Sequence, residues 1–208
     1  MAFKRNGYGQ VEPNQLSAQK TGQIYASLPL DSAVKVLQNG EFMYYDYSTG
    51  KVTAEPGVEG QEPMLVFNEV KLYEPFWQTS YKDFAMIRVG DNYVTSRLAT
   101  AEYGDGAETT GVSTAHSDWQ AGYRMDGIAP RLFKTNVGDI YTTNMVECGN
   151  EITYAAKDIL KLKKVTAADG TKTLVLSKTG EIDTIQFVVA KVYTMPDGQP
   201  GLKLQRIK

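Results

Sequence analysis

The sequence has one cysteine and one histidine among its 208 residues, and these shortages exclude several kinds of chemistry. Cys148 alone cannot form an internal disulfide, and a zinc site built on several cysteines is ruled out. His116, as the only histidine, excludes a site with two histidine ligands. We therefore expect no metal, no cofactor, and a reducing compartment or an assembly that does not depend on disulfides.

The sequence also lacks the common catalytic signatures. GxxxxGK[ST], GxGxxG and GxSxG are all missing. His116 lies in STAHSDW, and Ser113, Ser117 and Asp118 are too close to it in sequence to face it in triad geometry. Cys148 has no histidine near it in sequence, so we expect a buried or half-exposed structural thiol. We predict that the protein is not an enzyme.

Acidic and aromatic residues leave a few weaker alternatives open. Asp105 and Asp126 stand beside glycines, and a role in turns is favoured over calcium binding because EF-hand spacing is missing. Acidic side chains at 41, 46, 69 and 139 would pair as glycosidase carboxylates only in a suitable fold. The aromatic residues at 44, 45, 47, 76 and 77 could stack on sugars, but core packing explains most of them.

Charge and hydropathy limit the classes of partner that the protein is expected to bind. There are 22 basic and 24 acidic residues, which give a net charge of −2 and no basic field for nucleic acid. No apolar run approaches the roughly 18 residues that a membrane helix needs. The first residues, MAFKRNGYGQ, are not followed by the apolar segment of a secretory signal. We expect neither nucleic-acid nor membrane binding.

The residues that are abundant favour strands and tight turns. The chain has 19 glycines and 13 tyrosines, together with many short β-branched runs. We predict an all-β fold, mainly of antiparallel small barrels or a sandwich, with an extended N-terminal arm and a long irregular loop. The divisions are the arm at 1–29, a first β-unit at 30–98, the loop at 99–130 and a second β-unit at 131–208. A weak resemblance between residues 64–75 and 187–196 suggests two similar units, although one combined β-domain stays open.

Strands are predicted from alternation and turn signals. In the first unit, the run VKVL, an Asn39-Gly40 turn and an aromatic strand form a hairpin, and a turn at 48–50 leads into the next strand. Further strands are expected at 64–73, 85–89, 157–166, 172–177, 185–195 and 202–207. Residues 131–144, RLFKTNVGDIYTTN, predict a hairpin whose tight turn is VGD.

The N-terminal arm and the long loop are the predicted partner-binding segments. The arm is polar, and it is either a disordered terminus or a segment that orders against a neighbouring subunit, where the apolar anchors spaced along it would fill pockets. The loop is dense in Gly, Thr, Ser and Asp, and a loop of this length is normally functional or disordered. The predicted partner-binding residues are Phe3, Tyr8, Val11, Leu16, Ile24 and Tyr25 in the arm, and Trp119 and Tyr123 in the loop.

Three stretches carry a resemblance to a known group. YGQVEPNQLSAQKTGQIYA, VFNEVKLYEP followed by YKDFAM, and RLFKTNVGDIYTTN together resemble structural proteins of tailed bacteriophages encoded among head genes. The resemblance implies a capsid auxiliary or decoration (cement) protein, located in the virion and assembled in the host bacterial cytoplasm. Its partners would be the major capsid protein and neighbouring copies of itself. The alternative is a tail, head-fibre or host-glycan-binding virion component.

Overall fold

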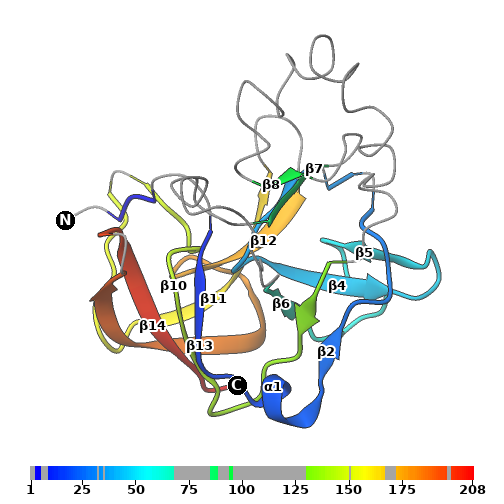
Figure 1. The fold of residues 1–208 in the computed structure, drawn as a ribbon. Helices are drawn as coiled ribbons and strands as arrows, with labels where there is room; N and C mark the ends of the chain where they lie inside the picture. The colour runs from blue at the N-terminus through cyan, green and yellow to red at the C-terminus, as the bar shows by residue number, and fades with distance from the viewer. Residues whose placement is uncertain are drawn as a thin grey trace, which may run out of the picture.

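The structure is a computed structural model that describes residues 3–5, 9–31, 33–34, 36–67, 85–88, 94–95, 130–149, 151–166, 172–195 and 198–208. It is nearly all β, and its main sheet is a curled antiparallel half-barrel, which confirms the predicted fold class (Figure 1). In chain order the elements are β1 (Val11–Gln15), α1 (Ser17–Thr21), β2 (Ile24–Tyr25), β3 (Val36–Leu37), β4 (Phe42–Asp46), β5 (Lys51–Thr53), β6 (Met64–Val66), β7 (Ala85–Arg88), β8 (Val94–Thr95), β9 (Leu132–Phe133), β10 (Ile140–Thr143), β11 (Ile159–Thr166), β12 (Lys172–Ser177), β13 (Ile182–Thr194) and β14 (Pro200–Arg206).

The main sheet mixes strands from both halves of the chain. Its strand order is β1-β10-β14-β13-β11-β12-β4-β6-β9-β2, with β5 paired to β4, and every pairing in it is antiparallel. The two halves meet where Leu174 of β12 lies opposite Phe42 of β4, and again where β9 pairs with β6. Strands β3, β7 and β8 form a separate small sheet.

The strands at the two ends of this order are neighbours in sequence. β1 and β2 are joined by the single helical turn α1, which ends at Gly22 in the left-handed conformation, φ +70°. β9 and β10, which pair with β2 and β1 respectively, are joined by the turn at 136–139. These two connections, β1–α1–β2 and the β9–β10 turn, therefore bring the ends of the curled sheet together. Figure 1 shows α1 beside the C-terminus at this place.

The described part of the segment expected to be a free arm, residues 3–5 and 9–29, is thus part of the fold, which corrects the prediction for these residues. β1 forms a ladder with β10, and Phe3, Val11 and Leu16 are buried in the core of their own chain. The physical reason is that the sheet would otherwise expose the edge of β10, and an unpaired edge costs backbone hydrogen bonds. The apolar spacing seen in the sequence serves internal packing.

Two predicted hairpins are wrong in their pairing. β9 and β10 flank a turn as expected, with Gly138 at φ +96°, but each pairs with other strands. The turn instead packs against the C-terminal strand, since the amide of Gly138 donates to the carbonyl of Arg206 at 2.9 Å. Similarly, β3 pairs with β7 rather than with β4, and the amide of Gly40 donates to the carbonyl of Val66.

Other sequence-based pairings are confirmed. The turn at 48–50 joins β4 to β5, β11 pairs with β12 across the Asp-Gly segment, and β13 pairs with β14. Residues 85–88 form a strand, and the predicted strand at 64–73 is described only as far as residue 67. These local hairpins have the clearest turn chemistry and alternation in the sequence.

The side chains form two cores because β4, β6 and β9 are covered on both faces. On one face, Phe42, Leu65 and Phe133 join the larger core with residues of β10 to β14. On the other face, the neighbouring residues Met43, Val66 and Leu132 join a smaller core with the segment at 28–54. Successive side chains of a strand point to opposite faces, so each of these short strands contributes to both cores.

Candidate binding site

A pocket lies at the margin of the smaller core, and we call it the tyrosine pocket. Its volume is about 170 Å³, and it is lined by Tyr25, Tyr45, Tyr47, Glu62, Met64 and Lys134, with Gln61 beside them. Strand register explains the assembly: Met43 lies opposite Met64, and Leu65 lies opposite Phe133. Tyr45, Met64 and Lys134 therefore project from the same face of three neighbouring strands. Tyr25 joins them from β2, at the end of the sheet.

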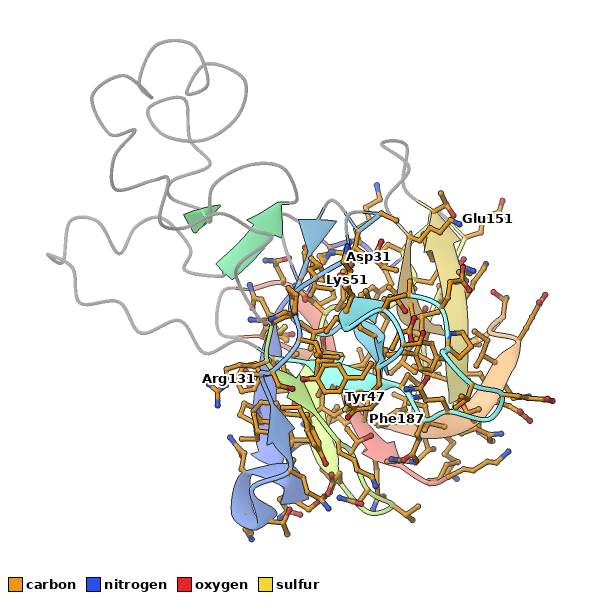
Figure 2. All side chains as sticks on the ribbon, turned by 90° about the vertical axis from the view of Figure 1, so that its right-hand side faces the viewer. Asp31, Tyr47, Lys51, Arg131, Glu151 and Phe187 are labelled. Carbon is orange, nitrogen blue, oxygen red and sulfur yellow. The ribbon has the colours of Figure 1, made fainter. Side chains whose placement is uncertain are left out.

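The three tyrosines differ sharply in exposure. Tyr45 is 2 % exposed and anchors the group, whereas Tyr25 is 36 % and Tyr47 is 74 % exposed. The ring of Tyr45 is 5.8 Å from that of Tyr25, at 86°, and 5.9 Å from that of Tyr47, at 60°. The contact with Tyr25 is edge-to-face and that with Tyr47 is tilted, and both arrangements are favourable for aromatic pairs. Figure 2 labels Tyr47 just beyond β4, on the side that faces the viewer.

The polar wall of the pocket is largely fixed by internal bonds. The side-chain amide of Gln61 donates to the carbonyl of Tyr45 at 2.5 Å and accepts from the amide of Gly57 at 2.8 Å. Glu62 is paired with Arg206, whose own side chain is only 6 % exposed. Lys134 is half-buried and has no ion pair within the described part of the chain. Among the described residues, the charge of Lys134 is thus not compensated by an ion pair.

The surroundings of Tyr45, the buried tyrosine of the pocket, change its acidity. Burial in the smaller core raises the pKa of Tyr45. A neutral phenol presents a negative ring face and a polar hydroxyl. The tyrosine pocket therefore combines aromatic faces, an apolar base at Met64 and one ammonium group.

The structure separates the residues predicted to bind a partner. Phe3, Val11 and Leu16 lie in the larger core and are therefore not available to a partner, whereas Ile24 packs against this core and is half-buried. Tyr25 alone of the arm residues lines the tyrosine pocket. Tyr8, Trp119 and Tyr123 lie outside the described residues.

Sequence reasoning missed Lys134, Met64, Gln61 and Glu62. Lys134 and Met64 share a face only through the β6–β9 pairing, which joins segments almost 70 residues apart in sequence. The alternation of 42–47 did carry a usable signal, because it places Tyr45 on one face and Tyr44 on the other. Tyr44 and Tyr45 are both buried, as core packing predicted, and Tyr47 is not.

Other candidates from the sequence give no site in the described residues. Cys148 is exposed, which corrects the expectation of a buried or half-exposed thiol, since it follows the last buried residues of its segment. His116, Asp105 and Asp126 lie outside the described part of the chain. Within that part, no group of three His, Cys, Asp or Glu side chains could hold a metal ion.

The search among known proteins gives no match: no family model, no curated protein and no solved structure is significantly similar to this chain. Across the described residues, none of the helices has the length and apolarity to cross a membrane. The site must therefore be interpreted from its own geometry.

Proposed function

We propose that this protein is a non-enzymatic virion protein of a tailed bacteriophage, which binds the lattice of the major capsid protein and reinforces the head. The resemblance of three sequence stretches to phage head proteins supports this role. A curled β half-barrel with a long connection between two of its paired strands is also a suitable design for a protein that attaches to a shell. Neighbouring copies of the chain are the second proposed partner.

The observation that carries the proposal is the closeness of the two points where the chain leaves and rejoins the body. Leu65 lies opposite Phe133 and Val66 opposite Leu132, and the amide of Phe67 donates to the carbonyl of Arg131 at 3.2 Å. Residues 68–129, which include β7 and β8, connect these two paired strands. Long connections between adjacent strands normally serve a function rather than the fold.

We therefore do not assign partner binding to the buried residues of the arm. The arm anchors Phe3, Val11 and Leu16 are committed to the core. Trp119 and Tyr123, which belong to the segment between the paired strands, keep the role that the sequence gave them. Aromatic residues of this kind dominate the binding energy of many interfaces.

The test is co-sedimentation with shells assembled from the major capsid protein of the same virion. We expect the full chain to sediment with the shells, and Trp119→Ala combined with Tyr123→Ala to reduce the bound fraction at least about tenfold, as loss of interface hot spots does. Tyr193→Ala, on β13, is the matched control and should bind normally. Circular dichroism must show that the variants are folded. A folded wild-type chain that stays in the supernatant would overturn the proposal.

A further inference from the structure

We propose that the tyrosine pocket binds one ring of an acidic sugar, with the ring against the exposed tyrosines and the acid group on Lys134. This goes beyond capsid attachment, and it does not depend on it. Three observations support it: the volume of the pocket, the exposure of Tyr25 and Tyr47, and the placement of one charge.

The volume fits a single six-membered ring. An apolar cavity of about 150 Å³ accommodates a benzene molecule, whereas a single water takes about 30 Å³ of liquid. The tyrosine pocket, at about 170 Å³, therefore has room for one ring with its substituents directed outward. Drug-sized ligands use pockets of roughly 300 Å³ or more, so a large ligand would be held here by one ring only.

The aromatic walls select a ring with apolar faces and polar edges. Tyr47 is 74 % exposed, although its ring is held in place against Tyr45. The negative face of an aromatic ring attracts C–H groups, which a pyranose presents on its faces while its hydroxyls point sideways. Tyr25 and Tyr47 also carry hydroxyls that can donate to or accept from these sugar hydroxyls.

Charge decides between neutral and acidic sugars. The carboxylate of Glu62 is already paired with Arg206, so it offers no strong site for a cation. Lys134 is half-buried without an ion pair in the described residues, and an ammonium group brings three donors. A carboxylate on the ring would compensate this charge and would accept hydrogen bonds from it.

A side chain from a protein partner satisfies these features less well. An aromatic side chain would fill the ring-sized space but would leave Lys134 without a counter-charge. An Asp or Glu side chain would pair with Lys134 but would leave the faces of Tyr25 and Tyr47 uncovered. A ring that carries an acid group meets both requirements in one ligand.

The pocket is largely pre-formed, which favours binding. Gln61 is held at both ends of its amide by Tyr45 and Gly57, and Met64 is built into β6. Fixed walls reduce the entropy that a ligand must overcome on binding. Only the exposed tyrosines and the stem of Lys134 need to adjust.

The test is a titration of the full chain with glucuronate, followed by aromatic ¹H–¹³C NMR, with glucose as the neutral comparison. We expect the resonances of Tyr25 and Tyr47 to shift with glucuronate at lower concentration than with glucose. Tyr47→Ala should abolish these shifts at Tyr25. Lys134→Gln should weaken glucuronate binding about fivefold to tenfold, as loss of a charged hydrogen bond does, and should remove the preference over glucose.

Tyr193→Ala and Lys191→Gln, on β13, are the matched controls and should bind like the wild type. No shift with either sugar, or unchanged binding by Tyr47→Ala, would overturn the proposal. Loss of shell binding by a folded Tyr47→Ala variant, with no sugar binding by the wild type, would assign the pocket to a protein partner instead. Because shells and sugars are tested separately, either proposal can fail without the other.

Discussion

The carboxylate of Asp139 accepts two hydrogen bonds from Ser17, one from its backbone nitrogen at 3.1 Å and one from its hydroxyl at 3.0 Å. The same carboxylate also accepts from the amide of Asn136 at 2.9 Å, and the side chain of Asn136 donates to the Ser17 hydroxyl at 2.7 Å. One acidic side chain thus closes its own turn and fastens that turn to the start of α1. The two connections that join the ends of the sheet, β1–α1–β2 and the β9–β10 turn, are therefore hydrogen-bonded to each other at this point.

We expect Asp139→Ala to destabilise the whole sheet by about 2–4 kcal/mol, because Asp139 is buried and its donors would lose a charged acceptor. Urea unfolding followed by circular dichroism measures the effect. Asp46→Ala is the matched control: Asp46 accepts from Ser48 and Thr49 in the β4–β5 turn, but it fastens no second element. If Asp46→Ala lowered the unfolding free energy as much as Asp139→Ala, the bonds from Asp139 to α1 would not be the cause of its effect.

The second prediction concerns the N-terminal segment. Leu16 is 2 % exposed in the larger core, so Leu16→Ala should cost about 2–4 kcal/mol of unfolding free energy. Removal of residues 1–16 should abolish cooperative unfolding, since it also removes β1 from the edge of β10. Val137→Ala, at a side chain that is 66 % exposed, is the control and should be nearly neutral. Normal stability of the truncated chain would instead support the interpretation of these residues as a free arm.

The contrast between what the sequence predicted and what it missed follows the range of the interactions. Turns such as those at 48–50 and 136–139 depend on a few adjacent residues, and so do the β11–β12 and β13–β14 hairpins. The pairing of β1 with β10 and of β6 with β9 joins segments that are far apart in sequence, and alternation says only that a partner exists. The anchors of the arm were recognised as anchors, but their partner proved to be their own chain.

The tyrosine pocket shows the same limit. Its tyrosines were visible in the sequence, and their uneven exposure was not. Tyr45 is buried because residues of the segments 28–37 and 52–54 cover its face of β4, whereas Tyr47 lies beyond the strand. Lys134 enters the pocket because residue 134 lies opposite residue 64 when the β6–β9 register is continued. No local pattern specifies that register.

The third prediction is a loss of stability at alkaline pH through Glu41. Burial raises the pKa of this carboxyl to about 8, against weaker lowering by the amide of Gln38, by Arg5 and by Thr173. In the unfolded chain its pKa is near the ordinary 4.5, so between about pH 4.5 and 8 the folded state holds a proton that the unfolded state releases. Rising pH therefore favours unfolding, by up to about 1.4 kcal/mol per pH unit from this group, until the folded state also ionises.

Glu41→Gln tests this prediction because glutamine stays neutral and still offers an oxygen to the amide of Gln38, which now donates to Glu41 at 2.8 Å. Urea midpoints at pH 5, 7 and 9 should fall with pH in the wild type and much less in the variant, and the variant should be the more stable at pH 9. Glu151→Gln, at an exposed side chain, should follow the wild type. Equal pH slopes for wild type and Glu41→Gln would contradict the burial argument.

Glu147 gives the opposite pH dependence. Partial burial tends to raise its pKa, but hydrogen bonds from Lys163, Ser177 and Thr179 outweigh burial and lower the pKa. The ammonium of Lys163 lies 2.5 Å from its carboxylate, and Ser177 is buried beside it. The contribution of Glu147 is thus present above the unfolded pKa of about 4.5 and is lost as the pH falls through the lower folded value.

We expect Glu147→Gln to lose about 1 kcal/mol at pH 7, because a charged acceptor for partly exposed donors is replaced by a neutral one. The difference from the wild type should shrink as the pH falls below about 4, when the native carboxylate is also protonated. Asp183→Asn is the matched control, since Asp183 and Lys208 are both more than half exposed and 3.6 Å apart. A difference from the wild type that is the same at pH 3 and pH 7 would show that Glu147 acts through packing rather than through its charge.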